Sequence, residues 1–108
     1  MSILKETYEH GHVIRVTASI FFDAVQEFDA AIQDAEDAGA SKVIIDVSGA
    51  EMICSSAITT LVKHHSSLKS KGKRLCLTGC NQSVKKVLVL LGLDRLVEMA
   101  DNVADALR

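Results

Sequence analysis

The run KVIIDV at residues 42–47 constrains the fold more than any other stretch of this sequence. It is short, almost continuously apolar and rich in β-branched side chains. Such a run is typical of a strand that is buried on both faces, and this happens mainly in sheets of parallel strands joined by helices. We therefore expect an α/β fold in which helices pack on a mostly parallel sheet around this strand.

The segments before this run predict a hairpin and a helix. Residues 3–8 alternate loosely between apolar and polar side chains, and residues 13–18 form a second strand-like run, with Gly11 free to take a positive φ in the turn between them. From Phe22 onwards, apolar residues recur every three or four positions, which predicts an amphipathic helix that ends at Gly39. The members of this apolar stripe are Phe22, Val25, Phe28, Ile32 and Ala35.

The segments after the run continue the alternation of helix and strand. A second helix is expected to end at Gly72, a strand at 73–79, and a third helix between a cap at Asn81 and an end at Gly92. A short strand near 96–99 and a helical turn at 101–107 follow. The second helix carries its apolar stripe on Ile58, Leu61, Val62, His65 and Leu68.

The expected order is therefore ββαβαβαβα. We predict one domain over residues 1–108, a single mixed, mostly parallel sheet with amphipathic helices as right-handed crossovers.

The composition argues against some classes of partner and predicts where the protein is located. The formal net charge of −2 argues against a nucleic-acid binder, because phosphate neutralisation needs clustered cations. The longest apolar run, at 87–91, is far shorter than the ~20 residues of a membrane span, so no membrane insertion is expected. Lys5, Glu6, Glu9 and Arg15 leave no signal-peptide core in the first twenty residues. We expect a cytoplasmic protein.

The sequence offers no constellation for catalysis. It has no glycine-rich phosphate loop and no plausible base near its adjacent serines, so we predict that the chain is not an enzyme. The three cysteines, Cys54, Cys76 and Cys80, are expected to be reduced thiols. Cys76 and Cys80 have a spacing that some metal sites use, but no second pair accompanies them, and we predict no metal and no cofactor.

The adjacent serines, Ser55 and Ser56, follow the buried strand at the start of the second helix, and sites gather at this end of the strands in α/β sheets. One interpretation is a plain N-cap, in which the Ser55 hydroxyl accepts a bond from a helix amide and contributes ~1 kcal/mol. The other is a phosphorylation site, since amides and dipole at a helix N-terminus tolerate an anion.

Residues 42–107, including the stretch ICSSAITTLVKHH at 53–65 and the tail LLGLDRLVEMADNVADAL, resemble the STAS domain of bacterial anti-anti-sigma factors, which are anti-sigma factor antagonists. The resemblance implies partner switching. The unphosphorylated domain binds an anti-sigma factor that is also a serine kinase of the histidine-kinase-like ATPase fold. Phosphorylation of Ser55, or alternatively Ser56, breaks the complex, and a serine phosphatase restores it. The implied partner-binding residues are Cys54, Ser55, Ser56, Ala57, Thr59, Thr60 and Lys63.

This sequence departs from the family motif Asp-Ser-(Ser/Thr)-Gly. The aspartate is Cys54 and the glycine is Ala57, and a further acidic position, in the loop before the first helix, corresponds to Phe21. In the family those acidic residues line the phosphorylation site. The alternative is therefore a STAS scaffold or assembly subunit, for example of a lipid-transport ABC complex, with no phosphoswitch.

Two further alternatives stay open. Cys54 is either a small half-buried apolar residue or, beside a helix N-terminus, a redox-sensitive thiol. The helix at 82–91 is apolar nearly all round, so either both of its sides are packed or one side meets a partner, and it leaves open a homodimer.

Overall fold

The computed structural model describes residues 3–108. As predicted, it contains a single mixed, mostly parallel sheet. Five strands lie in the order β1-β2-β3-β4-β5; β1 pairs antiparallel with β2, and β2 to β5 run parallel. The predicted domain of 1–108 includes residues 1 and 2, which lie outside the described residues. The elements in chain order are β1 (Ile3–Tyr8), β2 (Gly11–Val16), η1 (Phe22–Ala24), α1 (Val25–Asp37), β3 (Lys42–Asp46), α2 (Ser55–Ser70), β4 (Arg74–Thr78), α3 (Gln82–Leu90), β5 (Glu98–Ala100) and α4 (Val103–Ala106).

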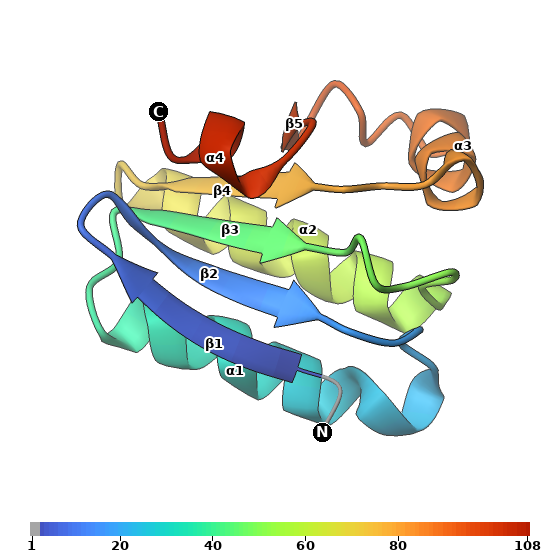
Figure 1. The fold of residues 1–108 in the computed structure, drawn as a ribbon, viewed down its shortest axis with the longest axis horizontal. Helices are drawn as coiled ribbons and strands as arrows, with labels where there is room; N and C mark the ends of the chain where they lie inside the picture. The colour runs from blue at the N-terminus through green and yellow to red at the C-terminus, as the bar shows by residue number, and fades with distance from the viewer. Residues whose placement is uncertain (1–2) are drawn as a thin grey trace.

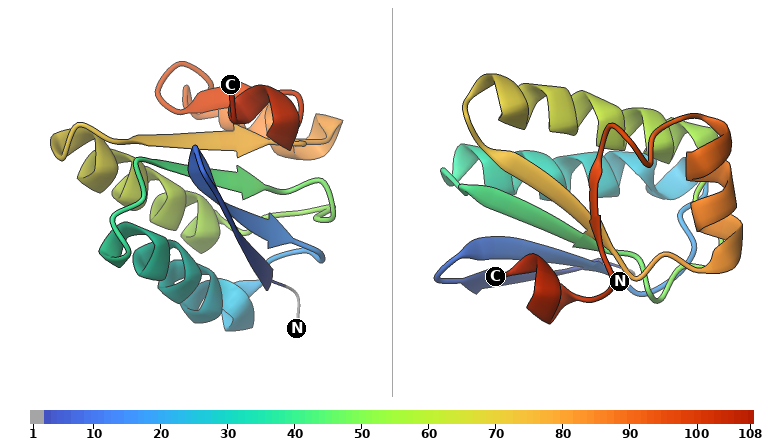
Figure 2. Two further views of the ribbon diagram at one scale, coloured as in Figure 1. Left: turned by 60° about the vertical axis from the view of Figure 1, so that its left-hand side comes forward. Right: turned by 90° about the horizontal axis from the view of Figure 1, so that it is seen from above.

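The helices cover the two faces of the sheet unequally. The long helices α1 and α2 lie side by side on one face, whereas the short α4 lies on the other (Figures 1 and 2). The helix α3 stands at the end of the sheet where the parallel strands terminate (Figure 1). Every residue of β3 is buried, which confirms a strand covered on both faces over residues 42–46 of the KVIIDV run.

The apolar core follows this layering. Its large part lies between the sheet and the α1–α2 layer and contains Phe28, Ile32, Ile45 and Leu61. A smaller cluster on the opposite face joins Val13, Ile44 and Cys76 to Ala106 of α4. Within residues 3–108, no helix combines the length and apolar character needed to cross a bilayer.

The predicted helix ends are confirmed. Gly39, Gly72 and Gly92 follow α1, α2 and α3, and each has a positive φ between 72° and 82°. The Asn81 side chain caps α3 by accepting a hydrogen bond from the Val84 amide at 2.8 Å. The last strand, β5, begins at Glu98, two residues later than predicted, because its bounds follow its pairing with Cys76–Thr78 of β4.

Two predictions in the first third of the chain are wrong. Gly11 does not have a positive φ; it is the first residue of β2, and a Cβ there would lie 3.0 Å from the Lys42 carbonyl oxygen. Close approach to a neighbouring strand, and not turn geometry, requires glycine. Phe22 is not part of the buried stripe, because it lies in the 3-10 turn η1 before α1 and its side chain is 81% exposed.

The apolar stripe of α2 also differs from the prediction. Val62 and His65 are only partly buried, whereas His64 is buried. The burial of His64 has its cause outside α2, since two carboxylates of α1 bind its ring.

Candidate functional site

Two loops meet at the end of the sheet and position the start of α2. The Cys54 amide donates to the Ile20 carbonyl at 3.0 Å, and the Ile20 amide donates to the Met52 carbonyl at 3.1 Å. These bonds form a parallel bridge between Ile20 and Ile53. As a result, Phe21 follows directly on the residue that binds Cys54, so Phe21 and Cys54 lie in adjoining loops.

Ser55 is the first residue of α2 and is not its N-cap. The N-cap is Cys54, which has extended backbone angles and whose carbonyl accepts from the amides of Ala57 and Ile58 at 3.1 and 3.2 Å. The prediction of Ser55 as a capping residue is therefore wrong. The Ser55 side chain is exposed, and its hydroxyl has no hydrogen-bond partner among residues 3–108. Capping therefore does not explain this serine.

The predicted partner-binding residues differ in burial. Ser55, Thr59 and Lys63 are exposed, while Cys54 and Ser56 are partly buried. Ala57 and Thr60 are buried, so their side chains offer little surface to a partner. Thr60 instead donates to the Ser56 carbonyl at 2.9 Å, within the helix.

Exposed apolar side chains lie near Ser55. The first turn of α2 contains no acidic residue. The side chains of Phe21, Phe22 and Met52, from the two loops that meet there, are 57%, 81% and 60% exposed. Phe21 and Cys54 thus bring an aromatic ring and a thiol to this region. Charge repulsion from these positions does not oppose a phosphate on Ser55.

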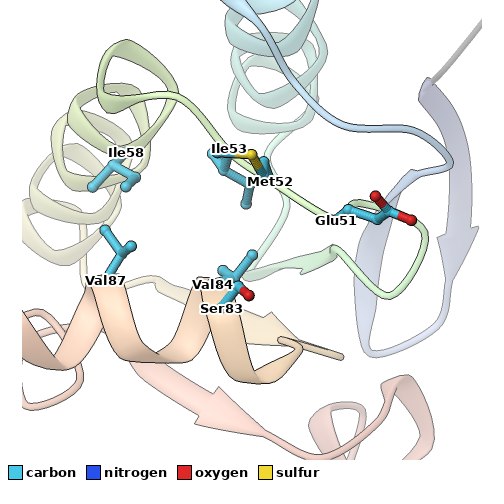
Figure 3. Close-up of a pocket in the computed structure, with 7 residues that line it drawn as sticks. All are labelled: Glu51, Met52, Ile53, Ile58, Ser83, Val84 and Val87. Carbon is cyan, nitrogen blue, oxygen red and sulfur yellow. The ribbon is translucent and has the colours of Figure 1, made fainter.

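An apolar hollow lies beside this surface, between the start of α2 and α3. Figure 3 shows Ile58 of α2 and Val87 of α3 on opposite walls of it, with Met52 and Ile53 from the loop before α2. Its remaining lining residues are Glu51, Ser83 and Val84. Sequence reasoning did not find this hollow; the one signal was the apolar character of 87–91.

The helix α3 packs on one side only. Val84 and Leu88 are buried, but Val87, Val89, Leu90 and Leu91 are exposed. Of the two alternatives for this helix, the structure excludes packing on both sides within residues 3–108. The exposed side of α3 is therefore an apolar face beside the hollow.

The three cysteines differ in environment. Burial raises the pKa of the Cys76 thiol to about 11 and that of Cys80 to about 11 as well, so both are neutral thiols near neutral pH. Cys54 is partly buried at the N-cap of α2. No disulfide links the three.

Residues 2–106 match the STAS domain family model, and the chain belongs to this family. A Thermotoga maritima protein named as an anti-sigma factor antagonist is 32% identical over 69 residues, which are 64% of this chain and 61% of that protein. The chain thus spans less than two thirds of that relative.

Solved structures resemble the fold over nearly its whole length. The crystal structure of an anti-sigma factor antagonist from Mycobacterium paratuberculosis has a TM-score of 0.89 at 21% identity, covering 97% of this chain and 89% of that one. The Bacillus cell fate determinant SpoIIAA in its phosphorylated form has a TM-score of 0.76 at 22% identity, covering 98% and 99%. At these identities, the likeness shows the fold alone.

Proposed function

We propose that this chain is an anti-sigma factor antagonist that binds an anti-sigma factor through the surface around Ser55 and is released when Ser55 is phosphorylated. The observation that carries the proposal is the position of Ser55, exposed on the first turn of α2 with a hydroxyl that makes no capping bond. Family membership supports the partner, which would be a serine kinase of the histidine-kinase-like ATPase fold, with a serine phosphatase to reverse the reaction. The site of action would be the cytoplasm, and the chain itself would have no catalytic role.

A phosphate on Ser55 would leave the domain folded but would weaken binding of the partner. The first amides of a helix have no partners within the helix, and the helix dipole favours an anion there. Phosphorylation adds roughly −1.5 to −2 charges. A partner surface that had packed against the neutral Ser55 hydroxyl would then have to desolvate this charge, which is costly without a matching cation.

The composition of the surface fits a protein partner. Exposed aromatic and Met side chains are enriched at the centres of protein interfaces, and polar residues at their rims. Beside Ser55, the exposed aromatic and Met side chains are those of Phe21, Phe22 and Met52. The exposed polar side chains along α2 are those of Thr59 and Lys63.

The test is binding of charge variants to the anti-sigma factors of the same genome, measured by calorimetry. We expect Ser55→Asp to weaken binding at least about 30-fold, because an unpaired charge in an interface costs about 2–5 kcal/mol. Ser55→Ala should bind like wild type. Ser66→Asp places the same charge on an exposed position of α2 further from the site, and it should also bind like wild type. If Ser55→Asp bound with unchanged affinity, the proposed release by phosphorylation would be wrong.

The second candidate is a constitutive STAS scaffold or assembly subunit without a phosphoswitch. Cys54 and Phe21 favour it, because they replace the acidic residues of the family's phosphorylation site. Phosphosite mapping of the protein from its own cells, in growth and in stress, separates the candidates. Occupancy at Ser55 that changes with condition supports the switch. An unmodified Ser55 in every condition, in protein that still co-purifies with one partner, supports the scaffold.

A further inference from the structure

A buried histidine connects the two long helices. His64 of α2 is 1% exposed. Its Nε2 lies 2.6 Å from Asp29 Oδ1, and its Nδ1 bonds Glu36 Oε2. Asp29 and Glu36 are seven residues apart on α1, which is about two turns, so both carboxylates project from the same side of that helix. The imidazole is therefore held at both nitrogens by carboxylates of the neighbouring helix.

This geometry determines how many protons the cluster holds. A neutral imidazole has one N–H donor and one acceptor nitrogen, whereas the imidazolium has two donors. With a neutral ring between two ionised carboxylates, the acceptor nitrogen would face oxygen lone pairs and no bond would form. Two bonds require one more proton, either on the ring or on a carboxyl.

The other partners of the carboxylates place that proton on the ring. Asp29 also accepts from Lys63 Nζ at 2.7 Å, and this bond together with that from His64 lowers the pKa of Asp29. Burial opposes ionisation of Glu36, but the bonds from His64 and from Ser67, at 2.8 Å, outweigh it and lower the pKa of Glu36. Both carboxylates are thus stabilised in their ionised form.

We propose that His64 is an imidazolium that bridges Asp29 and Glu36, and that its proton is a structural part of the fold that fixes α2 on α1. The charges around it support this assignment. Lys63 of α2 and Lys71, the residue that follows α2, reach the same two carboxylates, Lys71 at 3.5 Å from Glu36. The strands beneath the helices face this layer with apolar residues that do not titrate, among them Val43, Ile45 and Leu75.

If the ring lost this proton, the negative charge of Glu36 would be only weakly compensated. Its side chain is 1% exposed, and its remaining partners would be the Ser67 hydroxyl and the long contact to Lys71. A buried charge that loses a partner is strongly destabilising. Loss of this proton would therefore weaken the contact between α2 and α1.

The carboxylates determine the pH dependence on the acid side. Because the pKa values of Asp29 and Glu36 are lowered in the folded state, stability is lost as pH falls through their titration. The contact between α1 and the helix that carries Ser55 and Lys63 thus weakens as pH falls.

The direct test is ¹⁵N NMR of the histidine rings in the wild-type protein at pH 7.5. We expect both His64 nitrogens to have shifts of the protonated type and bonded hydrogens. His65, which has two buried ring nitrogens without a partner among residues 3–108, serves as the comparison ring. A His64 ring with one unprotonated nitrogen would overturn the proposal, and this readout needs no variant.

Discussion

Asn81 shows how much one side chain contributes at the candidate site. Its Oδ1 accepts from the Val84 amide and caps α3, and its Nδ2 donates to the carbonyls of Ala50 and Glu51 at 3.3 and 3.1 Å. The same residue therefore fixes α3 and the loop that leads to Ser55. It connects both walls of the apolar hollow.

We predict that Asn81→Ala lowers the free energy of unfolding by about 1–2 kcal/mol, the upper range for loss of a cap. Asn81→Asp keeps the accepting oxygen but loses the donated bonds, so it should lie between wild type and Asn81→Ala. Urea unfolding at constant pH measures both. If Asn81→Asp were as unstable as Asn81→Ala, the contribution would come from the bonds to the loop and not from the cap.

The two adjacent histidines show why single residues are hard to assign from sequence. Neighbouring positions on a helix differ by about 100° in direction. Periodicity alone therefore predicts which side of the helix is buried, but not which of two neighbouring residues lies at the edge of that side. What selects His64 over His65 is a pair of carboxylates 28 and 35 residues away on another helix. Nothing in the local pattern of α2 records those partners. The same holds for Ala57 and Thr60, whose burial depends on the packing of α2 as a whole.

Among the elements, α3 makes the sharpest contrast between buried and exposed leucines. Leu88 is 3% exposed and belongs to the core, whereas Leu90, two positions later, is 75% exposed. We predict that Leu88→Ala lowers the free energy of unfolding by about 2–5 kcal/mol. Leu90→Ala, the same chemical change, should stay within about 0.5 kcal/mol of wild type. Urea unfolding checks both, and a large loss for Leu90→Ala would show that its exposed face is packed in solution.

The elements themselves are predictable where a local physical cause defines them. Helices α1, α2 and α3 end at glycines with a positive φ, and β3 is a continuous apolar run, so sequence suffices for these. The start of α2 is displaced by one residue because the cap there is a carbonyl of Cys54, which any residue supplies. The strand β5 has only three residues, and its pairing with β4 decides its bounds. The hollow between α2 and α3 depends on two elements that no local pattern connects.

The molecule as a whole has two unequal faces. The α1–α2 layer covers one face of the sheet with two long helices, whereas the four residues of α4 cover the other (Figure 2). A single buried cation fixes α4 to the sheet: Lys42 Nζ donates to the Ala106 carbonyl at 2.6 Å and to the Arg108 carbonyl at 3.3 Å. Segments with few buried contacts open at lower free energy than the core. We therefore expect α4 to leave the sheet before the rest unfolds.

Cys76 reports on this opening because it is 1% exposed and packs in the cluster beneath α4. With burial raising its pKa to about 11, the thiol reacts with alkylating reagents only after α4 moves away. We predict that Lys42→Met raises the native-state alkylation rate of Cys76 by about 10- to 150-fold, since a hydrogen bond to a charged group contributes about 1.5–3 kcal/mol. Lys69→Met, at an exposed position of α2, should leave the rate unchanged. Mass spectrometry after timed alkylation gives the rate, and urea unfolding gives the global stability of each variant. If Cys76 is alkylated in every variant only as fast as global unfolding allows, α4 does not open separately, and the smaller face of the sheet is as firmly closed as the larger one.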